Sequence, residues 1–155
     1  EQTGFMYDKN TFKKLREFSY TTEGWGMCYN GEFIIVSDGT EFLYFYEPVT
    51  FKLHHKIAVF NNRGAVSLLN ELEFVNGFIY ANIYTTNTIV KINPSNGKVA
   101  TEIDFSSLLP KQYADDVDVL NGIAWNQEND HFYITGKLWP RLYEVRLYYK
   151  NSVEK

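Results

Sequence analysis

Hydrophobic and polar positions alternate along most of this chain, and one short strand pattern occurs three times. The three copies each end on an aromatic residue and lead into a turn rich in asparagine, aspartate or glycine; they are residues 23–29, 68–74 and 119–125. Alternation with a period of two predicts β-strands, and no long stretch repeats at helical spacing. Trp25, Asn70 and Asn121 hold equivalent positions, 45 and 51 residues apart. This spacing is typical of the blades of a β-propeller, or just beyond it.

The remainder of each copy completes a blade. A second apolar strand is expected over 31–39, 77–84 and 130–137, and a third over 43–48, 89–94 and 142–147. The first two copies continue into a fourth strand, over 51–59 and 98–103. β-Branched and aromatic runs bounded by turn residues are typical of strands. The unit is therefore predicted to be a four-stranded antiparallel meander, with an insertion around 108–116 in the third copy.

The first residues of the chain indicate an incomplete ring. Residues 4–13 resemble 44–52, the outer hairpin of the first full unit, but no inner strands precede them. Propellers typically have at least four blades. We therefore predict an all-β fold that is the C-terminal portion of a larger propeller. Residues 1–147 would form the outer half of one blade plus about three repeats, residues 148–155 would form a tail, and the missing N-terminal portion would be a partner.

Composition excludes several classes of function. The net charge is −4, which gives no electrostatic footprint for nucleic acid. No apolar stretch is long enough for a membrane span. Cys28 is expected to be a small buried apolar residue. His54 and His55 are expected on opposite faces of an outer strand, without the spacing of metal ligands, and we predict no metal site.

The repeat places polar and aromatic residues together at the inner strands. Trp25 offers an apolar face with an N–H donor, while Asn70 and Asn121 offer both a donor and an acceptor, which suits recognition of an amide. Lys137 follows a predicted strand and is expected at the mouth of the channel. Each residue also has an ordinary structural interpretation. Trp25 would then be core, the asparagines would satisfy backbone groups at strand ends, and Lys137 would be a surface lysine.

These residues lie within motifs that occur in series. The motifs are Glu23-Gly24-Trp25-Gly26, Ser37-Asp38-Gly39-Thr40, Leu69-Asn70-Glu71-Leu72-Glu73, Asp118-Val119-Leu120-Asn121-Gly122-Ile123-Ala124 and Thr135-Gly136-Lys137-Leu138-Trp139-Pro140. From Gly4 to Leu147 the chain resembles the glutamine cyclotransferase family, the plant and bacterial type of glutaminyl-peptide cyclotransferase. The resemblance implies a five-bladed propeller of four-stranded antiparallel blades that uses no zinc and no cofactor. It also implies an enzyme that converts the N-terminal glutamine of peptides or proteins to pyroglutamate and releases ammonia.

The resemblance also suggests roles for individual residues. Asn70 and Lys137 would be catalytic, and Trp25 and Tyr84 would bind substrate together with Asn121, which the repeat places beside them. Tyr84 stands in Asn82-Ile83-Tyr84, where the family has an Asn-Val-Trp type of motif, so the aromatic wall is kept with a smaller ring. The acid/base glutamate of the family belongs to a Gly-Glu-Gly motif in the upstream blades, which this chain does not contain.

Two other functions stay open at this point. The chain could belong to a catalytically inactive propeller that serves as a peptide- or protein-binding scaffold, since a fold does not fix a function. A sugar- or lactone-acting propeller enzyme would need calcium-binding carboxylates in the channel. This chain has tryptophan and asparagine at those positions, which argues against that function. Family members generally enter the secretory route or the periplasm, so we expect an extracellular or periplasmic protein.

Overall fold

The strands form four consecutive antiparallel sheets and one small hairpin. The computed structural model describes residues 2–113 and 116–148. The sheets pair β1 with β2, β3 through β6, β9 through β12, and β13 through β15, each in chain order, while β7 and β8 form the hairpin. The strands are β1 Thr3–Tyr7, β2 Lys14–Ser19, β3 Gly26–Tyr29, β4 Ile34–Ser37, β5 Phe42–Tyr46, β6 Leu53–Ala58, β7 Phe60–Asn61, β8 Gly64–Ala65, β9 Leu69–Val75, β10 Phe78–Ile83, β11 Thr88–Ile92, β12 Val99–Asp104, β13 Leu120–Asn126, β14 His131–Gly136 and β15 Tyr143–Val145.

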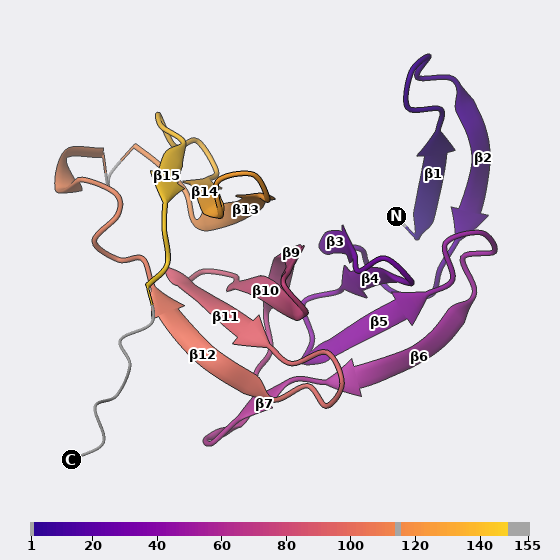
Figure 1. Cartoon of the computed structure of the whole chain (residues 1–155), viewed down its shortest axis with the longest axis horizontal. Coiled ribbons are helices and arrows are strands. Elements are labelled where there is room, and N and C mark those ends of the chain that lie inside the picture. The colour runs from indigo at the N-terminus through magenta and orange to yellow at the C-terminus, as the bar shows by residue number, and fades with distance from the viewer. Residues whose placement is uncertain (1, 114–115, 149–155) are drawn as a thin grey trace.

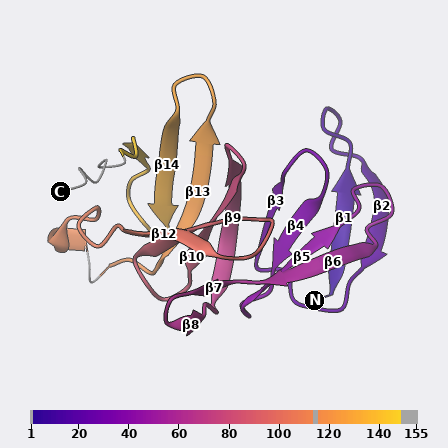
Figure 2. The ribbon, with the colours of Figure 1, turned by 60° about the horizontal axis from the view of Figure 1, so that its bottom comes forward.

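The sheets follow one another around an open arc (Figure 1). The first strands of the three larger sheets, β3, β9 and β13, lie toward the inside of the arc, and the fourth strands β6 and β12 lie outside. Figure 2 shows the inner strands running side by side. This arrangement confirms the prediction of an all-β fold built from propeller blades.

Three apolar clusters fill the spaces between successive sheets. The largest includes Ile35, Leu43, Leu72 and Ile79 and joins the β3–β6 sheet to the β9–β12 sheet. A second cluster joins the β9–β12 sheet to the β13–β15 sheet, and a third lies between the β1–β2 hairpin and the β3–β6 sheet. Cys28 is buried in the largest cluster, as predicted. Burial of sheet faces against one another stabilises the arc.

The three outer hairpins have the same kind of turn, followed by the same kind of β-bulge. In the turns after β1, β5 and β11, residues Phe12, Phe51 and Gly97 have positive φ and donate the same backbone hydrogen bond to the residue four positions earlier. In each pair the register then shifts by one residue. The β1–β2 hairpin is therefore the counterpart of β5–β6 and β11–β12.

The bulge in β6 corrects the prediction for the two histidines. His54 is the extra residue, because Phe45 pairs with His55 and Tyr46 pairs with Leu53. The two Nδ1 atoms lie 2.8 Å apart, and both rings contact Phe33. The expectation of opposite faces is wrong because a bulge interrupts strand alternation.

Two connections add to the predicted strands. The β7–β8 hairpin extends the end of β6 and was not predicted, and Phe60 forms a parallel bridge with Lys98 beside β12. The predicted insertion around 108–116 contains a 3₁₀ helix, Lys111–Tyr113, and residues 114–115 lie outside the described part. The predicted tail, 148–155, lies outside it as well except for Tyr148. No helix in the described residues has the length and apolar character needed to cross a bilayer.

Candidate active site

One pocket of about 390 Å³ brings together all of the residues that the sequence singled out. Its lining consists of Trp25, Asn70, Tyr84, Asn121 and Lys137. These residues belong to three successive sheets and the loops beside them, and the first and last, Trp25 and Lys137, are more than a hundred positions apart in the chain. The pocket lies at the starts of the inner strands, where the repeat predicted that equivalent positions would meet.

β-Bulges place the two asparagines at the pocket. In β9, Asn70 and Glu71 together oppose Asn82 of β10, because the register shifts between Leu69 and Leu72. In β13, Asn121 and Gly122 oppose Thr135 of β14 in the same way. A bulge breaks the alternation of side chains and re-aims one of them. Both asparagines therefore depart from the regular pleat at the same point of their blades.

Trp25 and Tyr84 form the aromatic wall. Their ring centroids lie 5.5 Å apart with an interplanar angle of 74°, which is an edge-to-face contact. The indole nitrogen of Trp25 donates to Glu23 Oε2 at 3.0 Å. Gly39, with a φ of +83°, lies behind the indole, where a Cβ would come within 2.7 Å of the ring. Trp25 is only half-buried, so it is a pocket wall rather than plain core.

Lys137 completes the pocket from the third sheet. Its backbone is held by two hydrogen bonds to 118–119, from Asp118 N to Lys137 O at 3.0 Å and from Lys137 N to Val119 O at 2.9 Å. Its Nζ lies 4.8 Å from the centroid of the Tyr84 ring. A cation at this distance from an aromatic face is attracted by the ring quadrupole. Within the described part of the chain the ammonium has no carboxylate partner, so it is available to a ligand.

The asparagine side chains are also available. Asn70 is 6% exposed, and its carboxamide makes no hydrogen bond with any of the described residues. The Oδ1 atom of Asn121 is buried and lacks a partner there. Buried polar groups are normally paired, so unpaired ones need an explanation. The interpretation of these side chains as satisfiers of backbone groups is therefore not supported, and a polar ligand would supply the missing bonds.

Two carboxylates beside the pocket were not singled out from the sequence. Glu71 Oε2 accepts from the backbone N–H of Ile123 at 2.9 Å, and Glu73 Oε1 accepts from Trp125 at 3.0 Å. Burial raises the pKa of Glu71 to about 7, against the effect of that hydrogen bond, and burial also raises the pKa of Glu73. Neither lines the pocket. They satisfy edge N–H groups of β13, and the only signal in the sequence is their alternation with apolar residues in β9.

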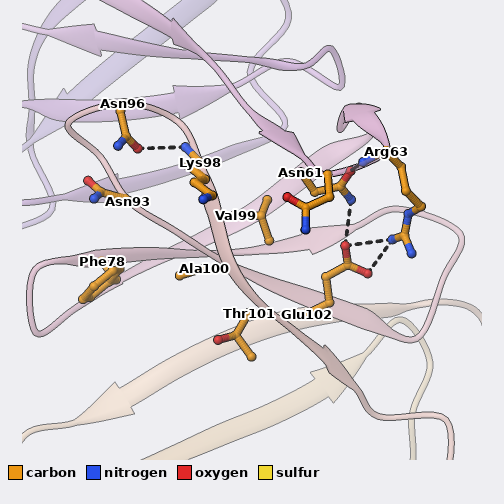
Figure 3. Close-up of a pocket in the computed structure, with 11 residues that line it drawn as sticks. Asn61, Arg63, Phe78, Asn93, Asn96, Lys98, Val99, Ala100, Thr101 and Glu102 are labelled. Carbon is orange, nitrogen blue, oxygen red and sulfur yellow. Dashed lines mark hydrogen bonds and ion pairs between the residues drawn. The ribbon is translucent and has the colours of Figure 1, made fainter.

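A larger groove of about 560 Å³ lies on the outer side of the arc, between β12 and the β7–β8 hairpin. Figure 3 shows that Arg63 faces Glu102 at one end of the groove. Arg63 donates to both oxygens of Glu102 at 2.7–2.8 Å, and Asn61 donates to Glu102 at 2.7 Å. These groups are satisfied without a ligand. In the described residues no cluster of three or more His, Cys, Asp or Glu side chains could hold a metal ion.

A family model described as glutamine cyclotransferase matches residues 1–147. The chain belongs to the glutamine cyclotransferase family. It is 39% identical over 149 residues to a glutaminyl-peptide cyclotransferase of Arabidopsis thaliana, which covers 94% of this chain and 47% of that protein. The chain therefore spans about half the length of this relative.

Solved structures agree with the family assignment. The crystal structure of Myxococcus xanthus glutaminyl cyclase superposes with a TM-score of 0.80 and 42% identity, covering 86% of this chain and 59% of that one. The WD40 β-propeller domain of Doa1 matches with a TM-score of 0.50 and 14% identity, over 81% of this chain and 38% of that one, and shows the fold alone. This member of the glutamine cyclotransferase family has all five predicted residues in one pocket. Their roles in substrate binding and catalysis stay predictions.

Proposed function

We propose that this chain supplies the substrate-binding wall of a glutaminyl-peptide cyclotransferase. The observation that carries this proposal is the single pocket lined by Trp25, Asn70, Tyr84, Asn121 and Lys137. Its chemistry is aromatic, amide and cationic, which suits a ligand with an apolar chain and a terminal carboxamide. The 42% identity to a solved glutaminyl cyclase supports the same substrate class.

The reaction mainly requires that a glutamine side chain fold back on its own amine. The α-amine nitrogen forms a bond to the side-chain amide carbon, the bond from that carbon to the amide nitrogen breaks, and ammonia leaves with the amine proton. Because nucleophile and electrophile belong to one residue, correct orientation removes much of the barrier. The edge-to-face pair Trp25 and Tyr84 would hold the methylene chain in this folded form.

Asn70 is proposed to stabilise the oxyanion that develops on the amide oxygen. Its carboxamide is buried and has no competing partner among the described residues, so its N–H₂ group can donate to that oxygen. A preorganised donor of this kind contributes on the order of 3 kcal/mol to the transition state. Lys137, whose Nζ lies over the Tyr84 ring, would add positive charge, and Asn121 would accept a hydrogen bond from the substrate.

Proton transfer is assigned to a glutamate outside this chain. The pocket residues include no carboxylate. In the proposed enzyme, the acid/base glutamate of the Gly-Glu-Gly motif comes from the N-terminal portion of the propeller, which is the expected partner of this chain. General acid–base catalysis by a positioned carboxylate would take the amine proton and deliver it to the departing ammonia.

The test is to incubate the complete propeller, containing both portions, with a peptide that begins with glutamine. Mass spectrometry would follow the loss of ammonia, with the spontaneous rate measured in the same buffer. Loss well above the spontaneous rate is expected. A folded sample that binds the peptide without accelerating the loss would indicate the inactive scaffold instead.

A further inference from the structure

The buried polar residues of the described chain gather around this one pocket. They are Ser37 and Asn82, both 0% exposed, and Asn70, 6% exposed. Ser37 and Asn82 do not line the pocket, and the sequence motifs gave them no role. They occupy matching places on the second strands of successive blades: Ser37 of β4 lies opposite Gly26, and Asn82 of β10 lies opposite the bulge at Asn70 and Glu71.

Each of these two side chains reaches across a blade boundary to the next inner strand. Ser37 Oγ donates to the backbone carbonyl oxygen of Asn70 at 2.5 Å, and Asn82 Oδ1 accepts from the backbone N–H of Gly122 at 3.2 Å. Both contacts fall within the bulges that contain the pocket asparagines. A bulge disrupts the ladder locally, so the backbone groups there need partners from elsewhere.

The boundary is also close-packed at this point. A Cβ on Gly26 would collide with the same carbonyl oxygen of Asn70 that Ser37 holds. The Nδ2 atom of Asn82 and the Oδ1 atom of Asn121 are buried and have no partner among the described residues. Asn82 thus holds the residue next to Asn121 with one end of its amide and keeps a free donor at the other.

We propose that Ser37 and Asn82 are positioning residues, Ser37 for Asn70 and Asn82 for Asn121. This inference rests on the proposed function. Each blade would set the orientation of the pocket asparagine on the next blade through a buried hydrogen bond to its bulge. The third equivalent residue, Thr135, lies in the last described sheet, where its Oγ1 donates to Arg141 O at 3.2 Å.

Double-mutant cycles in the complete propeller test the pairing. Ser37→Ala is expected to lower kcat on the order of tenfold with KM nearly unchanged, since a small misplacement of a catalytic group can cost up to about a hundredfold. In an Asn70→Ala background Ser37→Ala should then cost nothing more, because the residue that it positions is gone. By the same reasoning, Asn82→Leu should cost less in an Asn121→Ala background than it does alone. Asn62→Ala, in the outer groove, should leave kcat unchanged.

A purely structural role would give a different result. Ser37→Ala would then lower kcat by the same factor whether or not Asn70 is present, and that result would overturn the proposal. If Ser37→Ala does not fold, Ser37→Cys preserves the volume and retains only a weak donor, and the same cycle applies.

Side-chain amide NMR signals provide a readout that does not depend on activity. Ser37→Ala should shift or broaden the Asn70 amide signals and leave those of Asn121 in place, whereas Asn82→Leu should shift or broaden those of Asn121. Absence of turnover in the unmutated propeller would contradict the proposed function, whereas unchanged Asn70 and Asn121 signals in these variants would contradict the positioning role.

Discussion

Trp25 and Tyr84 pack edge to face, with their ring centroids 5.5 Å apart. The two rings belong to different sheets, and Lys137 from a third sheet lies over Tyr84. Tyr84 is also fixed by its backbone, since its N–H donates to Leu68 O at 2.8 Å. Tyr84 is therefore the residue at which the three blades converge on the pocket.

Tyr84→Ala should weaken substrate binding more than turnover. The substitution removes the aromatic contact to Trp25 and the surface under Lys137. Burial of one substrate methylene against an aromatic wall contributes about 0.8 kcal/mol, which corresponds to roughly a fourfold change in an equilibrium constant. We expect KM to rise by at least that factor. Steady-state kinetics with a glutaminyl peptide measure the change.

Tyr84→Phe is the matched control. It keeps the ring, the edge-to-face contact and the cation–π contact and removes only the hydroxyl, so KM should stay close to the unmutated value. A large rise in KM for Tyr84→Phe would show that the hydroxyl, rather than the ring, is what the pocket uses.

Gly39→Ala should displace the indole of Trp25. The new Cβ would lie 2.7 Å from the ring, and the φ of +83° is unfavourable for any L side chain. Gly31→Ala makes a fair comparison, because Gly31 has a φ of +96° and none of the described residues lies within 4 Å of the added Cβ. Both variants should lose about 1 kcal/mol of stability through backbone strain. Only Gly39→Ala should shift the indole N–H NMR signal of Trp25 and raise KM; equal effects from both would refute the role of Gly39 behind the pocket.

Glu71 should make stability fall as pH rises from about 4.5 to about 7. Burial raises its pKa to about 7 in the folded protein from an ordinary value of 4.5. In that window the folded state binds more protons than the unfolded state, so the free energy of unfolding decreases with increasing pH. The contribution is fully present below about pH 4.5 and is lost as pH rises through the folded value. Allowing for solvent screening, we expect a change of about 1–2 kcal/mol.

Glu71→Gln isolates this effect. Glutamine still accepts the N–H of Ile123 through its side-chain oxygen but cannot titrate, so denaturant unfolding at several pH values should show a flatter profile. Glu128→Gln, on an exposed turn, should keep the original slope. An unchanged slope in Glu71→Gln would mean that Glu71 titrates as an ordinary surface carboxylate.

The repeat was enough to predict the strands and part of the pocket. Equivalent inner-strand positions share one edge of a propeller, so Trp25, Asn70 and Asn121 could be brought together by spacing alone. Lys137 was expected at the mouth of the channel because it follows a predicted strand, and Tyr84 came from a motif shared with the family. All five line the same pocket.

The features that were missed depend on packing between blades. No local pattern marks His54 as a bulged residue or pairs Ser37 with Asn70, which is 33 positions away. Glu71 and Glu73 look like the polar positions of an alternating strand, yet their carboxylates accept hydrogen bonds from backbone N–H groups at the edge of β13. Such contacts depend on how closely neighbouring sheets pack, and the alternation and spacing of residues in the sequence do not predict that packing.

The most direct test of the central claim compares two asparagines in two different cavities. Asn70 lines the inner pocket and Asn62 lines the larger outer groove. With the complete propeller and a glutaminyl peptide, Asn70→Ala should lower kcat by about a hundredfold with a small change in KM, as expected for loss of an oxyanion donor. Asn62→Ala should behave like the unmutated protein. Normal turnover in a folded Asn70→Ala variant, or a comparable loss in Asn62→Ala, would contradict the assignment of the inner pocket as the active site.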